Sequence, residues 1–358
     1  MEISIVQLQA GLTLTVKGGV SYRYIYHKYI DLYFNQNYSD TKVDQMKYCL
    51  QCNKPKKEED LHYGQHLSCF QLVFRVSGKP EFFSLIQKDS TTDKKQDHRK
   101  TQSSPHLTTY FGGNYRKYEG SLGDAKYILK LSKPDYPELA PVEYVSNKIA
   151  FHCGLIIPTP FTLLDMGDGE LAFVSRNFMD SPSTHMTLNH IYHYPPLENA
   201  VHYTVEDILK TIYRETKSSV DTKIFLHTLI FDALVGNHDR HGRNLALIVS
   251  AKNQKLSPIY DNPSYLGLES GAMLKGSFSP RGKVWTKVSR EPEMIEYLEE
   301  MKRLGVLAVA KDFFQKISIV AIASYIDESN SLSSAMKLAM KKLILKRYQD
   351  LEVYLENK

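Results

Sequence analysis

The stretch LVGNHDRHGRNLALIVSAKNQKLSPIYDNPSYL, from Leu234 to Leu266, decides the fold of this chain. Two short apolar and β-branched runs within it, 245–250 and 256–260, flank a polar turn and predict a β-hairpin. Asn244 precedes the first strand and Asp261 follows the second, so antiparallel pairing would place their Cα atoms about 5 Å apart, as in facing residues. An amide oxygen and a carboxylate oxygen would then converge on one point.

A third polar group in this stretch is Asp239, in a loop that follows the apolar run 224–235, which predicts a buried helix. Oxygen ligands such as Asn244 and Asp261 suit Mg²⁺. A carboxylate beside the metal can orient an attacking hydroxyl and accept its proton, so the order Asp, Asn, Asp is typical of phosphoryl transfer by a kinase. The simpler alternative is a surface turn rich in Asp, Asn and Gly, which explains each residue singly but not their joint spacing.

The sequence motifs GNHDRHGRN at 236–244 and LSPIYDN at 256–262 resemble the catalytic core of HipA-like serine/threonine kinases, including the shorter HipT-type members and related bacterial effectors. The resemblance implies that Asp239 is the catalytic base and that Asn244 and Asp261 hold Mg²⁺. Phosphoinositide kinases share this order of residues in the loop, so the loop alone does not decide between a protein and a lipid substrate.

Upstream, KYILKL at 126–131 predicts a strand, and the residues from Pro141 to Gly154 predict a helix. Pro141 fits the first helical position, and Gly154 fits the residue after the helix end. Lys130 on the strand and Glu143 in the first helical turn would form the ion pair that positions the α- and β-phosphates of ATP in kinases. The family resemblance agrees. Alternatively, Glu143 favours the helix dipole alone and Lys130 is an exposed strand residue.

A further strand is expected at 171–178, where LAFVSRNF ends in a polar stretch. It resembles the hinge between kinase lobes, whose backbone groups bind the edge of adenine. Any edge strand could show the same pattern. His241 is expected to brace the catalytic loop at the nucleotide site. The hinge candidates are Ser175, Arg176, Asn177 and Phe178.

The phosphate-binding loop departs from the family pattern, because the residues before Lys130 carry neither a Walker motif nor the usual glycine signature of kinases. Gly112 and Gly113 are the candidates for donating backbone N–H groups to phosphate, or they form a hairpin turn. Members of the family are regulated by phosphorylation in this loop. The hydroxyl groups that precede it, candidates for autophosphorylation, are Ser103, Ser104, Thr108 and Thr109.

A separate constellation, Cys49, Cys52, His66 and Cys69, has the spacing Cys-x2-Cys, thirteen residues, His-x2-Cys. Three thiolates and an imidazole suit a closed, tetrahedral and therefore structural Zn²⁺ site. The set also resembles the cysteine knuckle that precedes the kinase core in many HipA-like proteins. Two alternatives stay open, namely that these are ordinary cytosolic thiols, and that His62 replaces His66 as a ligand.

Composition fits an intracellular enzyme with two or three lobes, since the chain has 358 residues, of which 42% are hydrophobic, and four cysteines. The start lacks the basic leader and the long apolar core of a secretory signal, and no run approaches the roughly 18–20 apolar residues that span a bilayer. We therefore expect a bacterial cytoplasmic protein, or an effector exported into a host cell by a machine that reads other signals.

The net charge of +5 is mild and does not predict direct binding of nucleic acid. The basic stretch Lys275–Arg290 contains the only tryptophan and lies where a kinase has its activation and substrate-binding segment. Such a stretch could attract an acidic protein, a phosphoinositide headgroup or RNA. It could also be a solvated loop.

Together these patterns predict an α+β, two-lobed, protein-kinase-like fold with a small β-rich N-lobe and a larger, mostly helical C-lobe. The expected function is ATP- and Mg²⁺-dependent phosphorylation of serine or threonine on a protein. The alternatives are a lipid kinase and a pseudokinase scaffold that binds nucleotide without transfer. The expected parts are an N-terminal segment 1–48, a cysteine-bearing piece 49–76, a polar linker or mobile loop 77–104, an N-lobe 105–178 and a C-lobe 179–358.

The resemblance also bears on partners. Family members include toxin kinases that phosphorylate aminoacyl-tRNA synthetases and are silenced by an antitoxin, and effectors that act on host proteins. Nothing in the residues chooses between these roles.

Overall fold

The computed structural model describes residues 3–8, 11–16, 48–55, 61–88, 116–180, 186–197, 202–242, 244–276 and 279–357. The chain divides into two compact units, 1–40 and 41–358. In the first unit, strands β1 (Ile3–Leu8) and β2 (Gly11–Val16) pair as an antiparallel hairpin. All other described elements belong to the second unit.

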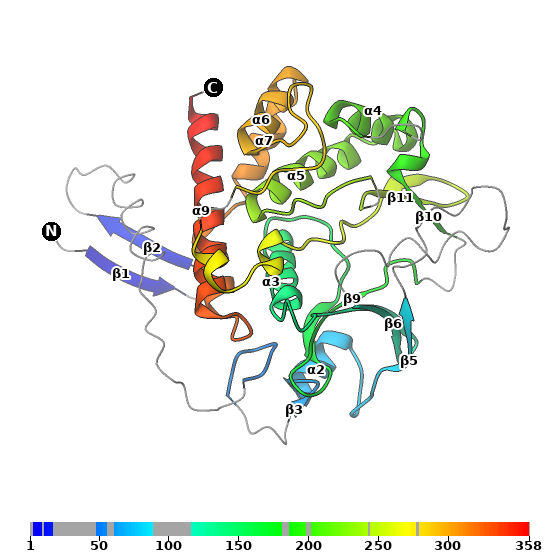
Figure 1. Cartoon of the computed structure of the whole chain (residues 1–358), viewed down its shortest axis with the longest axis vertical. Helices are drawn as coiled ribbons and strands as arrows, with labels where there is room; N and C mark the ends of the chain where they lie inside the picture. Colours follow the sequence, from blue (N-terminus) through cyan, green and yellow to red (C-terminus); the bar gives the residue numbers. More distant parts are fainter. Residues whose placement is uncertain are drawn as a thin grey trace. The chain divides into compact units, whose positions relative to one another are not determined.

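The N-terminal part of the second unit is built on a five-stranded antiparallel sheet in the order β5-β6-β7-β9-β8 (Figure 1). Because side chains alternate along a strand, Tyr127 and Leu129 face one side of the sheet and Ile128 and Lys130 face the other. The strand predicted at 126–131 is confirmed. The strands are β5 (Phe83–Lys88), β6 (Arg116–Leu122), β7 (Ala125–Leu131), β8 (Phe161–Asp165) and β9 (Leu171–Arg176).

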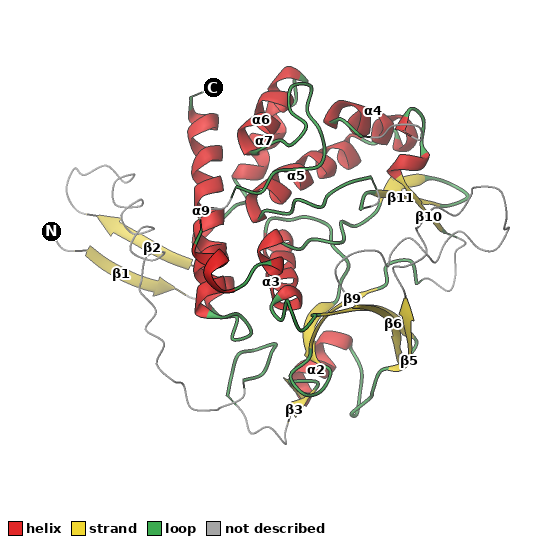
Figure 2. Cartoon of the chain, viewed as in Figure 1, coloured by secondary structure: helices red, strands yellow, loops and turns green. Residues whose placement is uncertain are grey.

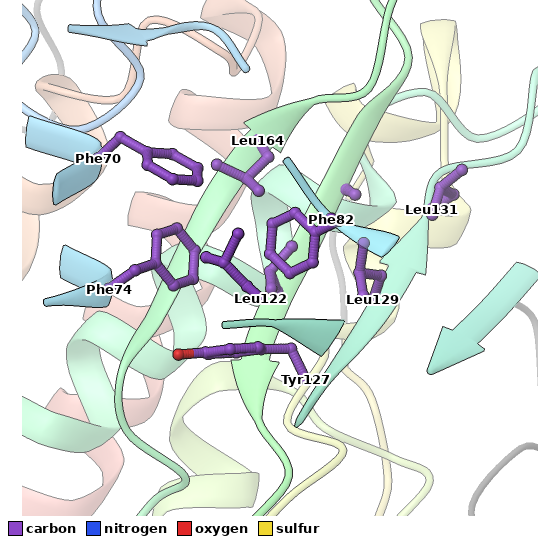
Figure 3. Packing of buried hydrophobic residues seen from close by; sticks show 10 residues of the cluster. Phe70, Phe74, Phe82, Leu122, Tyr127, Leu129, Leu131 and Leu164 are labelled. Atoms are coloured by element: carbon purple, nitrogen blue, oxygen red, sulfur yellow. The ribbon is translucent and has the colours of Figure 1, made fainter. Parts of the chain in front are cut away.

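One face of this sheet packs against α2 (Leu67–Phe74). Figure 3 shows the aromatic side chains Phe70, Phe74 and Phe82 above Tyr127, with Phe74 and Tyr127 in an edge-to-face contact at 5.2 Å between ring centroids. This geometry is one that aromatic pairs favour. The cysteine-bearing piece therefore forms one layer of the sheet's own core.

The other face of the sheet packs against α3 (Leu139–His152). The apolar residues Val142, Val145 and Ile149, spaced by three and four positions along this helix, are fully buried. Pro141 is the third helical residue, not the first as predicted, because the helix begins two residues earlier at Leu139. A proline is still tolerated there, since backbone N–H groups of the first turn have no partner in the helix. Gly154 follows the helix end with φ +76°, as its position predicts.

The C-terminal part is mostly helical, so the mixed α+β class is confirmed (Figure 2). Its central helix α5 is capped by Ser218 and ends at Gly236 in the left-handed region. No helix among the described residues combines the length and apolar character that a bilayer crossing needs. The helices are α4 (Val205–Thr216), α5 (Ser219–Val235), α6 (Met294–Arg303), α7 (Leu307–Phe314), α8 (Ile319–Asp327) and α9 (Ser334–Glu356), with short 3-10 turns η4 (Ile191–His193), η6 (Tyr265–Leu268) and η7 (Gly271–Lys275).

The predicted hairpin is present but shorter than expected. Strands β11 (Ala246–Val249) and β12 (Gln254–Leu256) pair in a three-stranded sheet with β10 (Thr187–His190). The ladder ends after Ser257, because the N–H of Ile259 donates to the carbonyl of Ile156 instead. Leu247 faces Leu256, so the same register would place position 259 opposite Asn244. Asp261 therefore lies two residues beyond the predicted facing position, and pairing within the hairpin does not explain how it meets the loop.

Candidate active site

Lys130 joins the sheet, helix α3 and the segment that follows β12. Its ammonium lies 2.5 Å from Glu143 Oε1 and also contacts Asp261 Oδ1. Both Lys130 and Glu143 are buried, with 5% and 0% of their surfaces exposed. Burial alone would lower the pKa of Lys130, but the two carboxylates outweigh it and raise that pKa, so the side chain is a cation.

Lys117 is a second buried lysine at this point, and the sequence reasoning missed it. It faces Lys130 across the β6–β7 ladder, and its Nζ lies 3.6 Å from Asp261 Oδ1. Burial lowers the pKa of Lys117, against the opposing effect of Asp261. Burial would raise the pKa of Asp261, but the charges of Lys117 and Lys130 hold it below its ordinary value. Asp261 is therefore ionised.

The backbone of Asp261 adopts the left-handed conformation, with φ +53°. Aspartate and asparagine visit this region more readily than other non-glycine residues do. Here Asn237 Nδ2 donates to the carbonyl of Asp261 at 3.3 Å. The carboxylate is thus aimed by the backbone and by a side chain of the predicted catalytic loop, which carries Asp239 and Asn244.

Within the catalytic loop, hydrogen bonds fix the backbone of Asp239 on both sides. Its N–H donates to Asn237 Oδ1 at 3.1 Å, and its carbonyl accepts from Asn244 Nδ2 at 2.9 Å. The carboxylate itself is 57% exposed, with His241 Nε2 at 3.7 Å. Because Nδ2 of Asn244 is committed to the loop, Oδ1 is the atom of that amide suited to a metal.

Arg240 is 2% exposed and ties together the parts of the site. Its guanidinium donates to both carboxylate oxygens of Asp232 on α5, at 2.8 and 3.0 Å. It also donates to the carbonyls of Asn244 at 3.2 Å and Tyr260 at 2.6 Å. Arg240 therefore joins Asn244, two residues before β11, to Tyr260, the residue before Asp261, which is the link that the hairpin ladder does not supply.

The same network continues to α3. Arg240 donates to Asn262 Oδ1, Asn262 Nδ2 donates to Asn147 Oδ1 at 3.0 Å, and Asn147 Nδ2 donates to the carbonyl of Glu143 at 2.8 Å. All these groups are buried. The catalytic loop is thus connected by continuous hydrogen bonds to the helix that carries Glu143.

A cleft of about 490 Å³, open to solvent, lies between the sheet and the segment around Asp261. The four hinge candidates predicted from the sequence line it together with Lys130, Glu143 and Asp261. The N–H groups of Arg176 and Asn177 already donate to the carbonyls of Pro160 and Lys126. The apolar lining consists of Ile128, Pro158, Phe173, Phe178 and Tyr260.

The structure thus brings Lys130, Glu143 and Asp261 together and ties Asp239 and Asn244 to them through the loop. The residues fit Mg²⁺, because an ionised carboxylate and an amide oxygen are suitable ligands and Glu143 Oε2 is a buried oxygen without a hydrogen-bond partner in the described part of the chain. Gly112 and Gly113 lie outside the described residues, as do the candidate hydroxyls Ser103, Ser104, Thr108 and Thr109.

The Cys and His residues predicted to form a metal site also come together. One donor atom from each of Cys49, Cys52, His66 and Cys69 lies within 4.8 Å of all the others. Cys52 Sγ and Cys69 Sγ are 3.3 and 3.8 Å from His66 Nδ1, against the roughly 3.5 Å expected between ligands of tetrahedral zinc. The alternative ligand His62 is excluded from this set, since its Nε2 lies 2.7 Å from the carbonyl of Pro80.

The thiols of this cluster do not ionise equally. Burial raises the pKa of Cys49, but backbone hydrogen bonds, first that from His66, bring it below its ordinary value. Burial, followed by the charge of Cys49, raises the pKa of Cys69 to about 12. Several thiolates can therefore be held at this spacing only with a compensating cation, which is the property expected of a zinc site.

Comparison with known proteins adds to this geometry. The family model described as "HipA-like C-terminal domain" matches residues 99–321. A Haemophilus influenzae protein named "Putative kinase" is 28% identical over 150 residues, which make up 38% of this chain and 44% of that protein. The chain thus matches less than half the length of this curated relative.

Two solved structures are also similar. The crystal structure of the Helicobacter pylori proinflammatory kinase CtkA superimposes with a TM-score of 0.57 and 17% identity, over 68% of this chain and 91% of that one. A chain of the Shewanella oneidensis toxin-antitoxin complex of HipA, HipB and operator DNA gives a TM-score of 0.49 and 15% identity, over 73% of this chain and 68% of that one. The first of these shows a shared fold.

Proposed function

Because this chain belongs to the family of the HipA-like C-terminal domain, we propose that it is an ATP- and Mg²⁺-dependent kinase that phosphorylates serine or threonine of a protein. The observation that carries the proposal is the contact of one buried ammonium, Lys130, with both Glu143 and Asp261, all three of which line the same cleft. An aminoacyl-tRNA synthetase or a host protein as the target, and an antitoxin as partner, stay predictions of the family resemblance.

In this proposal each residue has one task. Lys130, held by Glu143, binds phosphate oxygens, and Lys117 adds a second positive charge beside it. Asn244 and Asp261 hold Mg²⁺, which when bound neutralises charge on the phosphates. Asp239, whose side chain is exposed to solvent, orients the acceptor hydroxyl and accepts its proton.

The nucleotide base has its own part of the cleft. The apolar side chains of Phe173, Phe178 and Tyr260 suit the faces of a purine ring, and Ser175 with Asn177 supplies polar groups at its edge. His241 stays near Asp239 as a brace for the loop.

A scaffold that never transfers phosphate has no need to keep a base, two metal ligands and a lysine–glutamate pair together, which favours the enzyme.

The test is transfer from radiolabelled ATP in the presence of Mg²⁺ to three acceptors, namely the protein itself, proteins of a cell lysate, and vesicles of phosphatidylcholine with phosphatidylinositol. We expect label on serine or threonine, with Asp261→Ala reducing it to background because the metal ligand is lost. Label on lipid alone would make this chain a lipid kinase. Binding of ATP without transfer to any acceptor would make it a scaffold.

A second part of the proposal concerns the cluster of Cys49, Cys52, His66 and Cys69, which we propose holds a structural Zn²⁺. The ion would fix the hairpin of β3 (Leu61–His62) and β4 (Gln65–His66) and the start of α2. This module is attached to β8 by the buried side chain of Gln65, which donates to Thr162 Oγ1 and to the carbonyl of Leu163. The metal would therefore stabilise the outer layer of the sheet.

Protein purified without chelators is expected to contain about one zinc ion per chain by elemental mass spectrometry. Cys52→Ser should remove most of it and lower the melting temperature by at least about 5 °C, since each kcal/mol shifts it by about 2–4 °C in a domain of this kind. Cys153→Ala is the matched control, because Cys153 is a buried thiol outside the cluster. Full zinc content in Cys52→Ser would show that the cluster is not the site.

A further inference from the structure

The basic segment 281–287 lies beside the loop that carries Asp239, and its backbone bends at 283–284 and again from 287. Val284 and Thr286 are 2% and 4% exposed, whereas Arg281, Lys283 and Lys287 are exposed to solvent. Between the two bends, the backbone at Trp285 forms a parallel bridge with Thr204. The segment therefore presents three exposed cations, called the row below.

Packing places this row next to the loop that carries Asp239. Trp285 N–H donates to the carbonyl of Tyr203 at 2.9 Å. The ring of Tyr203 lies directly against Gly242 of the loop, where an added Cβ would be 2.7 Å from it. Asn237 and Arg240 share a small cavity with Arg281 and Lys283. His238, beside Asp239, has its pKa lowered by burial, and the charges of Asp239 and Lys283 both act on it.

The row is also strongly positive. The sequence from 275 to 290 contains no aspartate or glutamate. Arg281 is partly neutralised by Glu293 at 3.5 Å, but in the part of the chain that the structure covers no ion pair is found for Lys283 or Lys287. Trp285 is held at the centre of the row by the ring of His202 at 3.9 Å and by the guanidinium of Arg290 at 5.0 Å.

We propose that Arg281, Lys283 and Lys287 bind acidic side chains of a substrate peptide on both sides of the hydroxyl that is phosphorylated. This proposal rests on the function proposed above and names its substrate class. The three cations are spread over seven residues with Trp285 among them. A peptide with several acidic side chains therefore matches them better than a single phosphoinositide headgroup does.

The test compares three peptides with a central serine and with aspartate, asparagine or lysine at alternate positions on both sides. We expect the KM of the aspartate peptide to be about tenfold lower than that of the asparagine peptide, with kcat unchanged, because exposed ion pairs act mainly on binding and are individually weak. Raising the salt concentration should reduce the difference. The double variant Lys283→Glu/Lys287→Glu should abolish it.

The matched control is Lys342→Glu/Lys346→Glu on α9, two exposed lysines with the same separation in sequence and the same change in charge. It should keep the preference for the aspartate peptide. Equal KM values for all peptides, or a preference for lysine, would overturn the inference while leaving the kinase assignment intact.

Binding is measured separately with a fluorescent aspartate peptide that has alanine in place of serine, so a chain without any transfer activity still gives an answer. Tight binding lost in Lys283→Glu/Lys287→Glu would support the inference even if the proposed function failed. If vesicles of phosphatidylcholine with phosphatidylinositol 4-phosphate bind to this row and the peptide does not, the surface recognises lipid headgroups and the inference is wrong.

Discussion

Asp239→Asn is expected to lower kcat by about 10²- to 10⁴-fold, the range of a general base, while changing the affinity for Mg²⁺ and ATP by less than about twofold. The reason lies in how Asp239 is held. Its backbone N–H and carbonyl, not its carboxylate, make the hydrogen bonds that shape the loop. Asparagine keeps that shape and removes only the proton acceptor.

The same substitution at Asp261 should behave differently. Asp261 is in contact with Lys130 and near Lys117, so Asp261→Asn should weaken nucleotide binding as well as turnover. Measuring kcat and nucleotide affinity for both variants separates a base from a metal ligand. Asp168→Asn is the control, because Asp168 is an exposed aspartate in the β8–β9 turn with φ +52°, which asparagine tolerates.

Two outcomes would contradict the assignment of the base. If Asp239→Asn retains more than about a tenth of the wild-type kcat, proton transfer does not depend on this carboxylate. If the variant loses nucleotide affinity as strongly as Asp261→Asn does, Asp239 serves the metal and not the acceptor hydroxyl.

Functional residues can be proposed from the sequence where their reaction requires particular residue types at fixed spacings along the chain. The spacing of Asp239, Asn244 and Asp261 and the strand that carries Lys130 indicate a phosphoryl-transfer site by their order along the chain alone. Lys117 could have been found too. Gly123 and Asp124 form a two-residue turn, which fixes the register of a hairpin and so places Lys117 opposite Lys130.

Other features depend on contacts between distant parts of the chain. Strand β12 ends early because the N–H of Ile259 donates to the carbonyl of Ile156, about a hundred residues away in sequence. No local sequence pattern predicts this hydrogen bond, which competes with pairing in the hairpin. Arg240 in a polar loop reads like an exposed residue. The folded structure shows that Arg240 is buried against Asp232 and that it links Asn244 to Tyr260, the neighbour of Asp261.

That buried position leads to the second large expected effect. Arg240→Met should lower the free energy of unfolding by about 3–5 kcal/mol, because it leaves the carboxylate of Asp232 buried without its cation. Lysine should not replace it well, since an ammonium cannot reach both oxygens of Asp232 and also the carbonyls of Asn244 and Tyr260. Urea unfolding measures the change. Arg214→Met, at an exposed arginine, should shift it by less than about 0.5 kcal/mol.

A double variant separates stability from positioning. Arg240→Met/Asp232→Leu removes both charges, and an apolar pair often restores the stability that breaking a buried ion pair costs. We expect at least half of the lost stability to return. Activity should stay low, because the carbonyls of Asn244 and Tyr260 still lack the donor that joins them. If stability and kcat recover together, Arg240 serves only to neutralise Asp232. If kcat stays low in a stable protein, Arg240 and Asp232, which also accepts from Asn237 Nδ2, together position Asn244 and Asp261 for the reaction.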